Sequence, residues 1–175
     1  MIVFFVRHAS AGTPHENQKL DEKRPLDKQG IQDCAYIGRV LASLDVRVDA
    51  VVSSPLKRAL QTASLVGNEI GYDAKIVLTP ALRPEANYAA FRQMLEEHRS
   101  ADAIMVVGHE PNFSEFLGAI ISDPETPASI NLKKGAVARV DINNRRGDLR
   151  WLLTPKVVRS LFAATGHKVN LKDKK

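Results

Sequence analysis

Two arginines and two histidines of this chain could together bind an anion and act on it. They are Arg7, His8, Arg58 and His109. Guanidinium groups hold phosphate oxygens in a bidentate geometry, and a neutral imidazole has a lone pair that can attack phosphorus in line. We therefore expect these residues to form an anion site, and phosphate is its natural ligand.

Each of these residues follows an apolar segment whose composition predicts a buried strand. The three segments are Ile2–Val6, Ala50–Ser53 and Ala103–Val107. In an open α/β sheet, ligands bind beyond the carboxyl ends of the strands, where the strand order reverses. A single histidine at a strand end, or a single helical arginine, is more often structural. The convergence of three strand ends favours a functional site.

The remaining patterns alternate strand and helix and predict an α/β fold. Further strands are expected at Lys75–Leu78, Ala136–Ile142 and Asp148–Leu153, the last two joined as a hairpin through Asn143–Gly147. Helices are expected at Lys28–Leu44, from Pro55 to about Ile70, at Tyr88–His98 and at Phe113–Ile121. Asp27 is the expected N-cap of the first of these helices, and Ser54 is that of the second. Ser10–Arg24 is predicted to be a loop. We expect a mostly parallel central sheet with helices on both faces.

Length and composition indicate one cytoplasmic domain. The chain has 175 residues, a hydrophobic fraction of 44% and one cysteine, Cys34, so no internal disulfide can form. The apolar N-terminus has no basic flank, and Arg7-His8 interrupts it too early for a signal peptide. We expect a domain over 1–165 and a basic, solvated tail over 166–175. Most of the net charge of +5 lies in that tail, so nucleic acid is not an expected partner. A membrane is not expected either, because no apolar run approaches the ~20 residues of a membrane span.

Several motifs together resemble the histidine phosphatase superfamily, which includes the phosphoglycerate mutases. They are Arg7–Ala9, Ser53–Ala63 and Gly108–Pro111; three further motifs, Arg24–Gly30, Leu132–Arg139 and Trp151–Pro155, are similar to its short SixA-type phosphohistidine phosphatase branch. The resemblance implies that His8 is the phosphorylated nucleophile and that Arg7, Arg58 and His109 bind the phosphoryl group. Asp27 stands where the family often has threonine, and the insertion that carries a general acid in the mutases is missing.

Two carboxylates are candidates for a general acid, which an alkoxide leaving group would need. Glu85 follows the third predicted strand, where mutase-like relatives place their acid, and Glu110 directly follows His109. A solvated surface position is at least as frequent for each. No cluster of carboxylates or histidines with metal-ligand spacing is visible, so we expect no metal and no cofactor.

The sequence leaves three functions open. The chain could dephosphorylate phosphohistidine in a signalling protein of the histidine phosphotransfer type, hydrolyse a small phosphorylated metabolite, or bind phosphate without turnover. The paired histidines disfavour the third function, because binding alone needs only arginine and backbone N–H groups. The short chain favours phosphohistidine, because imidazole can leave as a neutral molecule without a strong acid. The oligomeric state is not indicated.

Overall fold

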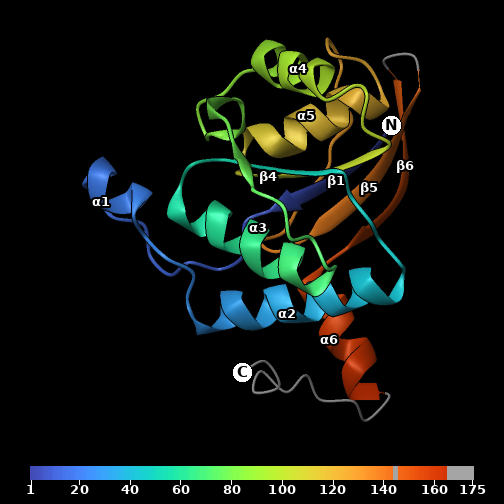
Figure 1. The fold of residues 1–175 in the computed structure, drawn as a ribbon. Helices are drawn as coiled ribbons and strands as arrows, with labels where there is room; N and C mark the ends of the chain where they lie inside the picture. Colours follow the sequence, from blue (N-terminus) through green and yellow to red (C-terminus); the bar gives the residue numbers. More distant parts are fainter. Residues whose placement is uncertain (144–145, 165–175) are drawn as a thin grey trace.

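The computed structural model describes residues 1–143 and 146–164, and Figure 1 shows their arrangement. The strands are β1 (Ile2–Arg7), β2 (Ala50–Ser53), β3 (Val77–Leu78), β4 (Ala103–Gly108), β5 (Val137–Asn143) and β6 (Arg146–Leu153). The helices are α1 (Gln18–Glu22), α2 (Lys28–Ser43), α3 (Lys57–Glu69), α4 (Tyr88–Glu97), α5 (Asn112–Ile121) and α6 (Pro155–Ala164), with a 3-10 turn η1 (Pro80–Leu82). The predicted tail, 166–175, lies outside the described residues.

The strands form one six-stranded sheet in the order β3-β2-β4-β1-β5-β6. β1, β2, β3 and β4 pair in parallel, whereas β5 is antiparallel to both β1 and β6. The predicted hairpin is therefore present, and its two strands extend further toward the turn than the sequence pattern indicates. The mostly parallel α/β fold predicted from the sequence is confirmed.

Both faces of the sheet are buried, which explains the continuous apolar runs of the central strands. Along β1, Phe4 and Val6 face one core and Val3 and Phe5 face the other. The first core is completed by side chains from α2, α3 and α6, and the second by side chains from α4 and α5. Figure 1 shows these two groups of helices on opposite sides of β1 and β4.

The N-terminus of α2 is fixed by its cap and by close contact with the loop after β1. The Asp27 side chain accepts a hydrogen bond from Gly30 N at 2.7 Å, as the predicted N-cap should. A side chain at Gly30 would place its Cβ 2.0 Å from the carbonyl oxygen of Ser10. Glycine is required here because the backbone of α2 packs directly against the backbone of the loop after β1.

Four sequence expectations differ from the structure. The segment expected to be a loop contains α1, which Asn17 caps through its side chain. Only Val77–Leu78 of the third expected strand is paired. Helix α3 begins at Lys57 rather than Pro55, because Pro55 and Leu56 form a bend and Leu56, not Ser54, occupies the N-cap position. Helix α6 has no counterpart among the predicted elements. Within the described residues, no helix is both long and apolar enough to cross a membrane.

Candidate active site

The carboxyl ends of β1, β4 and β2 lie side by side, as the sequence predicts. Arg7 pairs with Gly108 across β1 and β4, and Ser53 pairs with Val107 across β2 and β4. The backbone N–H of His8 donates to Gly108 O at 3.0 Å, so the chain stays paired just past the strand end. Helix α2 after β1 and helix α5 after β4 cover opposite faces, which makes this edge a switch point of the fold.

The hydrogen bond of His8 determines which of its nitrogens is free. Its Nδ1 lies 2.8 Å from Ala9 O, and a carbonyl oxygen can only accept, so Nδ1 carries the proton. The ring is buried, and burial followed by the charges of Arg58, Arg7 and Lys134 lowers its pKa to about 3, against the hydrogen bond to Ala9. His8 is therefore neutral at physiological pH, and its Nε2 keeps a lone pair.

His109 lies against His8 with its ring centre 4.8 Å away. Its Nε2 is 2.9 Å from the hydroxyl oxygen of Ser54, and its side chain is only 2% exposed. Burial, followed by repulsion from His8, Arg58 and Arg7, lowers the pKa of His109 to about 2. Both rings are thus neutral and lie among guanidinium groups.

The guanidinium groups of Arg7 and Arg58 are each held in place by hydrogen bonding through Nη1. Arg7 Nη1 donates to Leu132 O at 2.8 Å, in the loop before β5. Arg58, the second residue of α3, donates from Nη1 to Asp21 O at 2.9 Å and forms an ion pair with the Asp21 carboxylate at 3.2 Å. Asp21 lies on α1, so this short helix reaches the site.

Most of the buried side-chain atoms that lack a hydrogen-bond partner among the described residues belong to the predicted site residues. Within the described part of the chain, the buried side-chain atoms that lack a hydrogen-bond partner are Arg7 Nε, Arg58 Nε, His109 Nδ1 and Asn112 Oδ1. Buried polar atoms are nearly always satisfied in folded proteins, because an unmade hydrogen bond is costly. Three of the four residues are those that the sequence assigns to phosphate binding. A bound oxyanion would give their N–H groups an acceptor.

The two candidate acids have different surroundings. The Glu85 side chain is exposed, and its carboxylate accepts a hydrogen bond from Arg83 Nε at 2.5 Å. Its slight burial raises the pKa of this carboxyl, but its hydrogen bonds and the positive charge of Arg83 have the larger combined effect and lower the pKa. Burial raises the pKa of the Glu110 carboxyl above its ordinary value. The hydrogen bond that Ser114 Oγ donates to it at 2.8 Å and the positive charge of Arg7 lower the pKa, but by less. Glu110 is thus the better proton donor of the two.

Two residues that the sequence analysis does not assign to the site belong to its surroundings. Asp21 anchors Arg58, and Ser54 contacts His109. Ser54 and His109 are 55 positions apart, so no local pattern indicates their contact. Asp21 lies in a polar segment whose short helix has no apolar periodicity.

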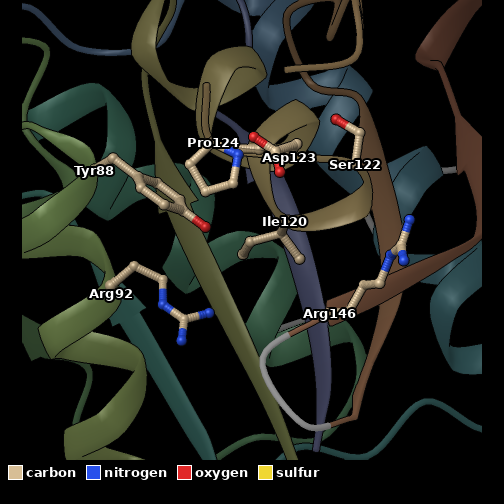
Figure 2. A pocket seen from close by; sticks show the side chains of 8 residues that line it. Tyr88, Arg92, Ile120, Ser122, Asp123, Pro124 and Arg146 are labelled. Carbon is tan, nitrogen blue, oxygen red and sulfur yellow. The ribbon is translucent and has the colours of Figure 1, made fainter. Parts of the chain in front are cut away.

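A separate hollow lies at the far end of α5 from His109 (Figure 2). Tyr88 and Arg92 from α4, Ile120 from α5 and Arg146 from β6 line it with the loop after α5. None of the predicted site residues is part of its lining. Among the described residues, no group of three or more histidine, cysteine, aspartate or glutamate side chains is arranged to hold a metal ion.

Comparison with known proteins identifies the family. A model of the histidine phosphatase superfamily (branch 1) matches residues 3–94, more than half of the chain. The chain therefore belongs to the histidine phosphatase superfamily, which confirms the resemblance seen in its motifs.

Individual relatives agree with this assignment. The chain is 27% identical to phosphohistidine phosphatase SixA of Escherichia coli over 159 residues, which is 89% of this chain and 94% of that protein. The solved structure of the protein histidine phosphatase SixA with tungstate shares the fold with a TM-score of 0.81 at 22% identity, covering 90% of this chain and 99% of that one. The α-ribazole phosphatase of Shigella flexneri has a TM-score of 0.69 at 20% identity, covering 89% and 97%.

Proposed function

We propose that this chain is a phosphatase that takes a phosphoryl group onto Nε2 of His8 and then releases it to water. The observation that carries the proposal is the set of unpartnered buried atoms on Arg7, Arg58 and His109, next to a neutral histidine whose Nδ1 is already bound. Membership of the histidine phosphatase superfamily supports the same reaction class.

The reaction would proceed in two displacements. The lone pair on His8 Nε2 forms a bond to phosphorus as the bond between phosphorus and the leaving group breaks. Arg7, Arg58 and His109 stabilise the charge on the equatorial oxygens. Water then attacks phosphorus, the N–P bond breaks, and inorganic phosphate leaves with His8 restored. The low pKa of His8 keeps its nucleophilic form present throughout the neutral range.

The leaving group determines whether an acid is needed. An alkoxide must be protonated as it departs, and Glu110 is the carboxyl best suited to donate, because burial raises its pKa. A phosphohistidine substrate needs less help, because its imidazole leaves as a neutral molecule when the far nitrogen is protonated. We propose phosphohistidine in a protein as the substrate, supported by the similarity to a phosphohistidine phosphatase over most of the chain.

A small phosphorylated metabolite is the second candidate. The fold is shared with an α-ribazole phosphatase, which by its name acts on a small molecule. The ratio of kcat/KM for a phosphohistidine peptide and for a panel of sugar and nucleoside phosphates distinguishes the two. A higher value for any metabolite would reject the proposed protein substrate while leaving the phosphatase activity intact.

Trapping of the phospho-enzyme tests the proposed nucleophile. A radiolabelled substrate should leave acid-labile label on the wild-type chain at His8, whereas His8→Ala should remain folded and lose both label and turnover. Circular dichroism and thermal unfolding check the fold of the variant. Turnover in a well-folded His8→Ala protein would reject His8 as the nucleophile.

We further propose that the reaction requires no metal. The guanidinium groups of Arg7 and Arg58 supply the positive charge that Mg²⁺ supplies in kinases. Activity should therefore be unchanged after treatment with EDTA and gel filtration. Loss of activity that Mg²⁺ or Zn²⁺ restores would contradict this proposal.

A further inference from the structure

We propose that Ser54 is a positioning residue that holds the proton of His109 on Nδ1, so that His109 donates a hydrogen bond to the transferring phosphoryl group. The inference rests on the proposed phosphoryl-transfer function and adds a residue to its machinery. Ser54 acts through His109 and would not itself touch the substrate.

The first step is the direction of the hydrogen bond between Ser54 and His109. The Ser54 side chain is fully buried, and Leu56 N–H points at its oxygen from 3.4 Å. Its hydroxyl proton therefore needs an acceptor. Among the hydrogen bonds of the described residues, the other partner of this hydroxyl is His109 Nε2 at 2.9 Å, which can accept the proton. Ser54 therefore donates, and Nε2 accepts through its lone pair.

The second step follows from the charge of the ring. A neutral imidazole carries one proton, so an Nε2 that accepts leaves that proton on Nδ1. His109 Nδ1 is the buried nitrogen that lacks a partner within the described residues. In this tautomer it is an N–H donor, like the unpartnered Nε–H groups of Arg7 and Arg58. The opposite tautomer would present a lone pair, which repels an oxyanion.

The two histidines then hold complementary roles although both are protonated on Nδ1. The Ala9 carbonyl holds the proton of His8 on Nδ1 and frees Nε2 for attack. Ser54 holds the proton of His109 on Nδ1 and makes that nitrogen the donor. A main-chain acceptor thus makes His8 the nucleophile, and a side-chain donor makes His109 the hydrogen-bond donor to the phosphoryl group; their ring centres lie 4.8 Å apart.

The tautomer can be measured directly in the free wild-type protein. Long-range ¹H–¹⁵N correlation spectra distinguish Nδ1–H from Nε2–H imidazole, and the chain has only five histidines to assign. His109→Gln identifies the resonances of His109. We expect His109 to be protonated on Nδ1 at pH 7. An Nε2–H tautomer at His109 would overturn the inference even in an active enzyme.

Variants test whether Ser54 causes this tautomer. In Ser54→Ala, His109 should populate the Nε2–H form, and binding of inorganic phosphate should weaken by roughly 2- to 10-fold, as for loss of one hydrogen bond. Ser53→Ala is the matched control, because Ser53 is an equally buried serine whose hydroxyl donates to Ser54 O. It should leave the tautomer and phosphate affinity unchanged.

These measurements separate the inference from the proposed function. An unchanged tautomer in a folded Ser54→Ala protein would overturn the role of Ser54. A His109 Nδ1–H form that depends on Ser54 supports it, even if no phospho-enzyme is trapped on His8, since the spectra require no turnover.

Discussion

Arg58 and Lys57 are adjacent cations at the start of α3 with opposite surroundings. Arg58 is 5% exposed and bonded to Asp21, whereas Lys57 is exposed. Arg58→Lys should lower kcat/KM by roughly 10- to 100-fold, because an ammonium cannot reproduce the planar fork and charge-assisted bonds contribute about 1.5–3 kcal/mol each. Lys57→Ala should stay close to wild type. Small, equal losses at both positions would show that Arg58 has no part in binding the phosphoryl group.

The sequence predicts which residues meet at the site but not how they are oriented. Arg7, His8, Arg58 and His109 can be found because each follows an apolar strand, and parallel strands bring their carboxyl ends to one edge. The orientation of the imidazoles depends on Ala9 O and on the Ser54 hydroxyl. Such contacts depend on rotamers and on the exact end of a strand, which composition and spacing do not specify.

At the scale of elements, two helical glycines have very different environments. A Cβ at Gly30 of α2 would lie 2.0 Å from Ser10 O, whereas a Cβ at Gly67 of α3 would lie in ordinary contact with the Tyr72 side chain at 3.8 Å. Gly30→Ala should therefore destabilise the fold by about 1–3 kcal/mol, as overpacking does, and disturb the loop after His8. Gly67→Ala should raise stability by roughly 0.5–1 kcal/mol, the helix preference for alanine.

Urea unfolding of both alanine variants, followed by circular dichroism, measures this difference. Because Ser10 follows Ala9, whose carbonyl orients His8, Gly30→Ala should also lower kcat, while Gly67→Ala should not. Equal stability of the two variants would show that the backbone at Ser10 moves aside freely.

The apolar face of α2 made that helix predictable, whereas the short helix α1 and the true length of β3 were not predictable. Helix α2 buries Cys34, Ile37 and Leu41 at helical spacing, and its cap residue Asp27 is visible in the sequence. Helix α1 has five residues and buries none of them, so it lacks this signal. It is held instead by ion pairs, Asp21 with Arg58 and Glu22 with Arg83. Similarly, β3 has two exposed residues and no alternation that could define its length.

The whole molecule buries two neutral histidines between its parallel strand ends, and this couples folding to pH. Burial lowers the pKa of His8 to about 3 and that of His109 to about 2, whereas histidine in an unfolded chain titrates near pH 6.5. Between these values the unfolded chain binds more protons than the folded one. The free energy of unfolding should therefore fall as the pH is lowered from about 6.5, by up to roughly 1.4 kcal/mol per pH unit for each histidine.

Urea unfolding at several pH values between 5 and 7 measures this slope. His8→Gln and His109→Gln should each reduce it, because a neutral amide does not titrate, and the double variant should have the smallest slope in this range. The raised pKa of Glu110 acts in the opposite direction, because the folded chain then binds the proton more readily, so the slopes are compared in a Glu110→Gln background. Inorganic phosphate is left out, because an anion among Arg7, Arg58 and the two rings would favour protonated imidazole and mask the effect. A wild-type stability that is flat from pH 7 to 5, or an equal slope in the double variant, would show that the histidines are not buried as neutral groups.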